Sequence, residues 1–172
     1  RNLLFFHPDS LQAIREIKNL SVHDEETMKE DFFAFIEEKS YTFSFKIIFM
    51  LAMLKHVDSH GEAPIDTIVE EYRGFYLRRH EQHLVVDRPS CIYTDKFLQD
   101  PVAVKRNMLA NPFEKFERKR FVHYVKDLSL IGFNPILFEN LSEQERTDLT
   151  TLLQEHLREY YEELGGLGDE LL

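Results

Sequence analysis

Cationic side chains at helical spacing are the residues of this chain best suited to a chemical role, the binding of an anion. In the run NPFEKFERKRF, Lys115, Arg118 and Lys119 follow i, i+3, i+4 spacing and therefore share one face of a helix. Phe113 and Phe116 are three residues apart and are predicted to face inward. Positive groups aligned in this way favour contact with phosphates, so this segment is a candidate surface for a nucleic-acid backbone.

The distribution of charge sets this segment apart from the rest of the chain. The net charge of the 172 residues is −10, a balance that by itself argues against a polyanionic partner. Residues 78–126 nevertheless hold 11 Lys and Arg against 6 Asp and Glu, whereas residues 1–77 and 127–172 carry net charges of −6 and −9. The positive excess indicates either an anionic contact at this segment or neutralisation of the acidic C-terminal segment within the fold.

Other residues that could do chemistry do not form a recognised pattern. The nitrogen and sulfur ligands that zinc would need could come from His56, His60, His80, His83 and Cys91. A helix end at Gly61 is expected to keep the first two histidines apart, and no second cysteine supports the set. The sequence also lacks the G-x-x-x-x-G-K-[ST], G-x-S-x-G and H-E-x-x-H motifs. We therefore predict no catalytic residue, metal, cofactor or small-molecule substrate for this chain.

The sequence indicates a protein of a reducing compartment and predicts no membrane-spanning helix. Cys91 is the one cysteine, so no intrachain disulfide can form, and no signal-peptide pattern occurs near the start. The most apolar run, IIFMLAMLKHV, is well short of the roughly 20 residues that a membrane span requires. We expect a cytoplasmic protein in which this run is a core helix.

Hydrophobic periodicity predicts a mainly α-helical fold with one small β-hairpin. Helices are expected over about 10–20, 44–57, 64–79 and 101–110. A second helix is expected to open with the acidic residues 24–26, a basic helix to follow Pro112, a short helical turn to begin at 134–135 and a last helix to span 141–164. The helix over 44–57, which Ser44 is expected to cap, is apolar on every side and is predicted to be the centre of the domain. Ser142 and Glu145 are spaced as a capping box, and Pro112 is expected to separate two helices.

A hairpin is predicted directly after the basic helix. FVHYV and LSLIGF are rich in β-branched and aromatic residues, with Lys126 and Asp127 at the turn between them. A recognition helix followed by a wing has this order of elements. The stretch from Leu84 to Pro101 carries no periodic pattern, and a loop of that length is expected to be functional or partly disordered.

The segments SFKIIFMLAMLKHVDSHGEAPIDTIVEEYRGFYLRR, VVDRPSC, VKRNMLANPFEKFERKRFVHYVKDLSLIGFNPILF and REYYEEL resemble a region that follows the motor domains of bacterial superfamily II helicases, often linked to DNA restriction or phage defence. The resemblance spans about Tyr41 to Leu164. It implies one winged-helix-like accessory domain, with N-terminal helices over 1–40, the core over 41–140, a C-terminal helix over 141–164 and a flexible tail over 165–172. The long connection before the basic helix and the kink at Pro112 depart from the usual winged helix, which argues against direct reading of the major groove.

Two functions are therefore expected of this chain. In the first, a non-catalytic accessory domain of a bacterial DNA helicase or restriction-defence protein positions nucleic acid, DNA rather than RNA, through phosphate contacts. The cations that would make those contacts, and that must then converge on one patch, are Arg78, Arg79, Lys105, Arg106, Lys115, Arg118, Lys119 and Arg120. In the second, the chain is a protein-interaction scaffold that docks onto motor or nuclease domains without touching nucleic acid, as the acidic C-terminal helix favours.

Overall fold

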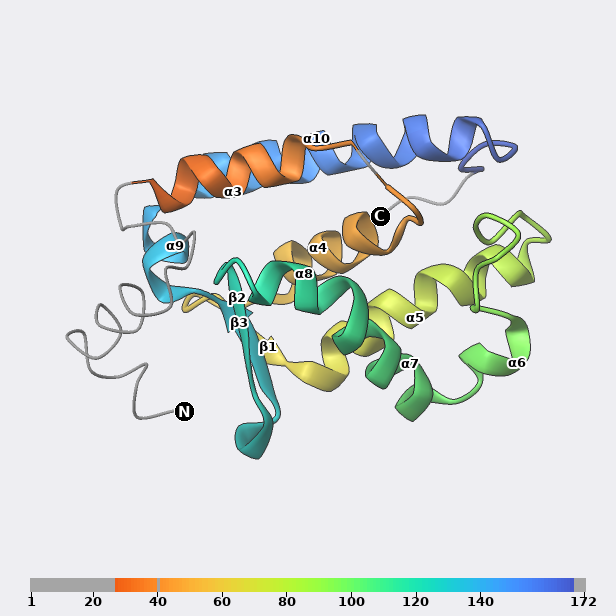
Figure 1. Ribbon diagram of the computed structural model, residues 1–172, viewed down its shortest axis with the longest axis horizontal. Coiled ribbons are helices and arrows are strands. Elements are labelled where there is room, and N and C mark those ends of the chain that lie inside the picture. The colour runs from red at the N-terminus through yellow and green to blue at the C-terminus, as the bar shows by residue number, and fades with distance from the viewer. Residues whose placement is uncertain (1–26, 40, 169–172) are drawn as a thin grey trace.

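The computed structural model describes residues 27–39 and 41–168 (Figure 1). The helix expected over 10–20 and the acidic residues expected to open the second helix lie outside these ranges. Within them the protein is mainly α-helical with a small antiparallel sheet, as predicted. No helix among the described residues combines the length and the apolar character needed to cross a membrane.

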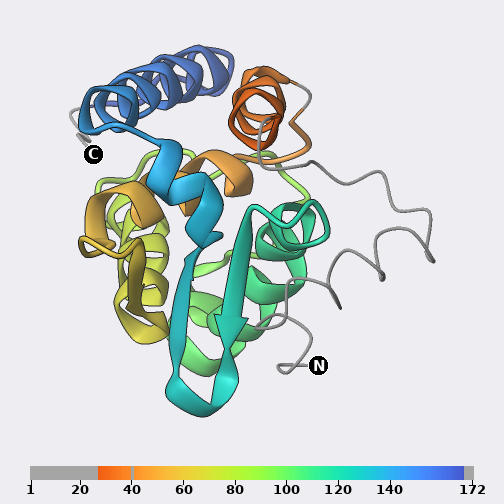
Figure 2. The same cartoon turned by 90° about the vertical axis from the view of Figure 1, so that its left-hand side faces the viewer.

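Helix α4 (Phe45–His56) lies at the centre, as its sequence predicts. Every residue from Ile47 to Met53 is buried. Helices α5 (Ile65–Glu81) and α10 (Glu143–Glu162) pack against it, while α3 (Met28–Glu37) lies beside α10 on the upper side of the molecule (Figure 2). Ser44 occupies the N-cap position of α4, but its side chain does not cap the helix as predicted. Its hydroxyl donates to the Asp87 carboxylate at 2.6 Å and accepts no hydrogen bond from an N–H of the first turn.

The predicted hairpin is part of a three-stranded sheet. Strands β2 (Val122–Val125) and β3 (Leu130–Phe133) pair as expected, and β1 (Glu62–Pro64) adds to the other edge of β3, giving the order β1-β3-β2. The turn is longer than the predicted two residues, since a single helical turn (Lys126–Leu128) is followed by Ser129 with φ of 52°. Along the chain, α4 and β1 are followed by α5, by shorter helices up to Glu117 and then by the β2–β3 hairpin, here called the wing.

The helix that precedes the wing is divided, as predicted for Pro112. Helix α7 (Pro101–Met108) and the four-residue helix α8 (Glu114–Glu117) are joined through Asn111, whose backbone is extended at φ −169° and ψ 116°. Both predicted inward residues of this segment are buried on α4: the Phe113 and Phe116 rings lie 6.0 and 5.6 Å from the Phe49 ring. The core therefore sets the orientation of the basic segment.

The connection between α5 and α7 is ordered by contacts with the core. It contains the short helix α6 (Asp95–Leu98), and the side chains of Asp87, Tyr93 and Leu98 are buried. Periodicity did not predict the structure of this connection, because the residues that anchor it to the core are single residues spaced irregularly along the chain.

After the wing, α9 (Pro135–Asn140) leads to α10, whose Ser142 and Glu145 form the predicted capping box.

We expect Gly61→Ala to lower the free energy of unfolding by about 2–5 kcal/mol, because φ is +80° and an added Cβ would lie 2.7 Å from the Phe138 ring. Gly165→Ala is the matched control, since Gly165 also has positive φ, at +98°, but nothing lies within 4 Å of its Cβ position. Urea unfolding of both variants measures the difference. Equal losses of unfolding free energy in the two variants would mean that the Phe138 ring moves away from the added Cβ without destabilising the fold.

Candidate nucleic-acid interface

Two of the eight predicted cations, Lys115 and Lys119, lie together on α8 and the turn after it. Burial lowers the pKa of Lys46 on α4, and the charges of Lys115 and Lys119 lower it further. The Lys119 Nζ atom lies 5.3 Å from the centre of the Phe35 ring, and the Lys46 Nζ atom lies 3.8 Å from the same centre. Lys46, which the sequence analysis did not select, is therefore brought to the predicted basic surface.

Arg118 follows the last residue of α8, but its side chain pairs with a carboxylate of α8. Its guanidinium is exposed and pairs with Glu114 at 3.4 Å, one helical turn earlier. An exposed pair of this kind contributes little to stability and is easily exchanged for another partner. Arg118 is thus available to an anion, at the cost of releasing Glu114.

Arg79 is not a surface contact, which corrects the prediction for this residue. Its side chain is fully buried, and the guanidinium lies 4.1 Å from the ring of Tyr161. It donates to the carbonyls of Val85, Gly166 and Leu167 at 2.7, 3.1 and 3.0 Å. Arg79 therefore joins α5 to the segment that follows α10. Part of the predicted flexible tail is held by these bonds, and residues 169–172 lie outside the described ranges.

Arg78 and Arg120 also lie in surroundings that do not favour a phosphate. Arg78 lines a shallow hollow along α5 that includes Asp66, Glu70 and Glu71. Arg120 has φ of 63° and is half-buried, and its carbonyl accepts a hydrogen bond from the Asn134 side chain at 3.0 Å. The eight cations therefore do not converge on a single patch, and these two are better explained by local structure.

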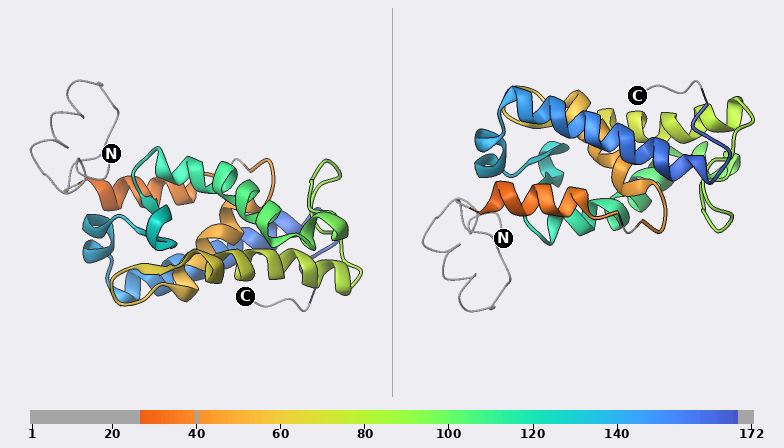
Figure 3. Two further views of the ribbon diagram at one scale, coloured as in Figure 1. Left: turned by 90° about the horizontal axis from the view of Figure 1, so that it is seen from below. Right: turned by 90° about the horizontal axis from the view of Figure 1, so that it is seen from above.

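The remaining two predicted cations lie on α7. The Lys105 ammonium is 4.0 Å from the Asp66 carboxylate on α5 and 6.0 Å from the ring of Tyr124 in β2, so it lies between α5 and the wing. Arg106 is exposed, as is Lys126 at the tip of the wing. Seen from below, α8 lies on one long side of the molecule and α5 on the other, while α7 slants from α8 towards α5 and packs against it (Figure 3). The cations of α8 thus lie away from α5, whereas Lys105 on α7 reaches Asp66 at the edge of the acidic hollow on α5.

A chain of hydroxyl groups fixes α7 to the core. The Tyr93 hydroxyl donates to the Asn107 side chain on α7, and it is 2.8 Å from the hydroxyl of Tyr72 on α5. Burial raises the pKa of Tyr72 well above its usual range, as it does for Tyr93. These hydroxyls stay protonated and serve as hydrogen-bonding links, so α7 is held rigidly while its opposite face is exposed.

The residues considered for zinc do not come together. His56 Nε2 lies 2.6 Å from Glu71, whereas His80 Nε2 lies 2.9 Å from the Tyr93 carbonyl. Burial raises the pKa of the Cys91 thiol to about 11, which keeps it protonated. Across residues 27–39 and 41–168, no three His, Cys, Asp or Glu side chains are placed to hold a metal ion.

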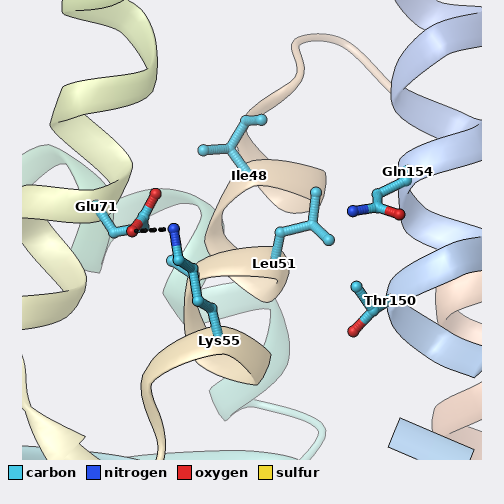
Figure 4. A pocket seen from close by; sticks show the side chains of 7 residues that line it. Ile48, Leu51, Lys55, Glu71, Thr150 and Gln154 are labelled. Carbon is cyan, nitrogen blue, oxygen red and sulfur yellow. Dashed lines mark ion pairs between the residues drawn. The ribbon is translucent and has the colours of Figure 1, made fainter. Parts of the chain in front are cut away.

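A cavity of about 240 Å³ lies between α4, α5 and α10, away from the basic side. Its walls include Ile48, Leu51, Ala52 and Thr150 (Figure 4). The charged groups at its edge neutralise each other, since Lys55 pairs with Glu71 at 3.1 Å. The lining is mainly aliphatic and does not provide a nucleophile with an adjacent base.

No family model, curated protein or solved structure matches this chain. The resemblance to a helicase-associated region therefore remains a prediction.

Proposed function

We propose that this domain contacts the phosphate backbone of duplex DNA through α7, α8 and the wing. The observation that carries the proposal is the position of Lys105, Arg106, Lys115 and Lys119 on the divided helix that precedes the wing, in a protein of net charge −10. Cations concentrated at one side of an acidic protein favour a polyanionic partner at that side.

The contacts would position DNA and would not read its sequence. The basic segment consists of α7, an extended residue at Asn111 and a helix of four residues, so no long straight helix is offered to the major groove. Lysine ammonium groups bind phosphates as point charges. Binding should accordingly depend strongly on salt and weakly on sequence.

A domain that only holds the backbone suits an accessory role. We place it within a larger bacterial DNA helicase or restriction-defence protein, in line with the resemblance of residues 41–164 to regions that follow helicase motors. The chemical step would then belong to other domains, and this one would orient the duplex for them.

We expect the wild-type protein to bind a fluorescently labelled DNA duplex with affinity that falls steeply between about 50 and 200 mM salt. Lys105→Gln/Arg106→Gln should lower the log–log salt slope by about 1.8, because each lost phosphate contact contributes about 0.9. Anisotropy titrations provide the measurement, and a double-stranded RNA competitor tests the preference for DNA.

The control is Lys39→Gln/Lys55→Gln, which removes two lysines paired with Glu159 and Glu71, each at 3.1 Å. This variant changes net charge by the same amount at other surfaces. Failure of the wild-type protein to bind the duplex, or equal effects of the two variants, would overturn the proposal.

A protein-interaction scaffold is the second candidate function. The outward residues of α10 are largely acidic, and Val85 and Ile92 in the connection before α7 are exposed at 50% and 45%. A basic domain of the same assembly could dock against such a surface. This function would be favoured if the wild-type protein binds no nucleic acid.

A further inference from the structure

The cavity between α4, α5 and α10 has an aliphatic floor. Helices α5 and α10 each pack against α4 and form the two walls of the cavity (Figure 4). The α4 residues at its base are Ile48, Leu51 and Ala52, and all three are buried. Because they belong to the central helix of the fold, this apolar floor is rigid.

Short side chains leave the cavity open. Ala52 ends at its Cβ atom, and on the α10 wall the Thr150 hydroxyl is occupied with its own helix, donating to the Arg146 carbonyl at 3.0 Å. The volume is about 240 Å³, and an apolar cavity of about 150 Å³ already holds benzene. At about 30 Å³ for each water-sized group, the cavity accommodates an aliphatic chain of roughly six to eight carbons.

The edge of the cavity carries a cation that can bind a further acceptor. Lys55 lines the cavity, and its side chain is 55% exposed, so the cavity meets solvent at this residue. Among the described residues, Glu71 is the one carboxylate that pairs with Lys55, at 3.1 Å. An ammonium has three N–H donors, so this pair leaves Lys55 able to hold a second oxygen.

Glu71, by contrast, already has two donors. The same Oε1 atom lies 2.6 Å from Nε2 of His56 and 3.1 Å from Nζ of Lys55. Burial acts to raise the pKa of Glu71, but the hydrogen bonds from His56 and Lys55 hold this pKa below its usual value and keep the carboxylate ionised. A ligand ammonium would have to displace one of these donors, whereas a ligand carboxylate would not. The charges at the edge therefore favour an anion.

We infer that this cavity binds a small aliphatic carboxylate, with its chain on the α4 floor and its carboxylate on Lys55. Burial of the chain supplies most of the affinity, and the contact with Lys55 sets which end of the ligand faces solvent. The inference is independent of the proposed function, because the residues that line the cavity do not belong to α7, α8 or the wing.

The test is a titration of the wild-type protein with butanoate, hexanoate, octanoate and decanoate, followed by the ¹³C-methyl NMR signals of Ile48 and Leu51. These signals should move, and the affinity should rise by up to about fourfold for each added methylene until the cavity is filled at roughly eight carbons. At equal chain length, hexanoate should bind more tightly than 1-hexanol. Hexylamine should bind most weakly, because Glu71 is already paired with two donors.

Two variants separate the head contact from the chain contact. Lys55→Met should lower the affinity for octanoate by about two- to fivefold, to that of 1-octanol, because it removes an exposed charge pair with the ligand. The control is Lys39→Met, which removes an exposed lysine paired with Glu159 at 3.1 Å and should bind octanoate as the wild-type protein does. Thr150→Leu should fill the cavity from α10 and abolish binding.

The wild-type titration by itself can overturn the inference. Methyl signals of Ile48 and Leu51 that do not move with octanoate in large excess, or tighter binding of hexylamine than of hexanoate, would do so. Equal affinity of Lys55→Met and the wild-type protein for octanoate would exclude the head contact and with it a carboxylate site. Binding that persists in folded Thr150→Leu would place the ligand outside this cavity.

Discussion

Charge reversal on α8, in Lys115→Glu/Arg118→Glu/Lys119→Glu, is expected to remove most of the affinity of the domain for duplex DNA. Loss of three phosphate contacts would lower the salt slope by up to about 2.7 and the affinity by up to about 500-fold at about 0.1 M salt. The added carboxylates also repel the backbone, so reversal should exceed neutralisation. Anisotropy over about 50 to 200 mM salt measures both quantities.

The fold should survive this triple substitution, because the altered side chains are exposed or half-buried while Phe113 and Phe116 hold the segment to α4. The single variant Arg118→Glu should have the smallest effect of the three, since Arg118 pairs with Glu114. Arg158→Glu on α10 is the control for Arg118→Glu, because both variants change the net charge by the same amount. An unchanged affinity and slope in a folded triple variant would exclude α8 from DNA binding and favour the scaffold function.

Loss of the Asp87 carboxylate is expected to lower the free energy of unfolding by about 3–5 kcal/mol. Asp87 is 5% exposed and accepts hydrogen bonds from the Ser44 amide at 3.0 Å, the Ser44 hydroxyl at 2.6 Å and the Arg88 amide at 2.7 Å. The Tyr160 hydroxyl donates to it as well. Burial and then this hydrogen bond raise the pKa of Tyr160, so the donor stays protonated. Asp87→Ala would leave these donors without an acceptor.

Urea unfolding of Asp87→Ala, Asp87→Asn and Asp127→Ala tests this prediction. Asparagine retains one acceptor oxygen and should recover part of the loss, whereas Asp127 is exposed at the turn of the wing and its removal should cost less than about 0.5 kcal/mol. A loss below about 1 kcal/mol in Asp87→Ala would show that the connection before α7 is not anchored by this carboxylate.

Features encoded by neighbouring residues could be predicted from the sequence. The apolar residues of α4 occur on every side of a helix, which requires that the helix be surrounded. Pro112 disfavours a helical residue before it, and Asn111 is extended. Ser142 and Glu145 satisfy each other's backbone groups over three residues, so the start of α10 needed no tertiary information.

The candidate site depended on contacts that spacing along the chain does not reveal. Periodicity correctly placed Phe113 and Phe116 inward and thereby pointed Lys115 and Lys119 outward. It did not predict that Lys46, about seventy residues earlier, would meet those lysines, because their proximity arises from the packing of α3, α4 and α8 around aromatic rings.

Tertiary structure likewise decided which cations are internal. Arg79 and Arg106 are each the second residue of a basic pair near the end of a helix. Arg79 is buried, whereas Arg106 is exposed. Arg79 is inside because carbonyls after α10 fold back to accept its protons, and a buried charge is tolerated only where such acceptors exist. Strand β1, three residues long, exists because β3 offers it a partner. The sequence determined the local elements, since their signals lie within a few residues, whereas the partners of Lys46, Arg79 and β1 came from distant segments that only folding brings together.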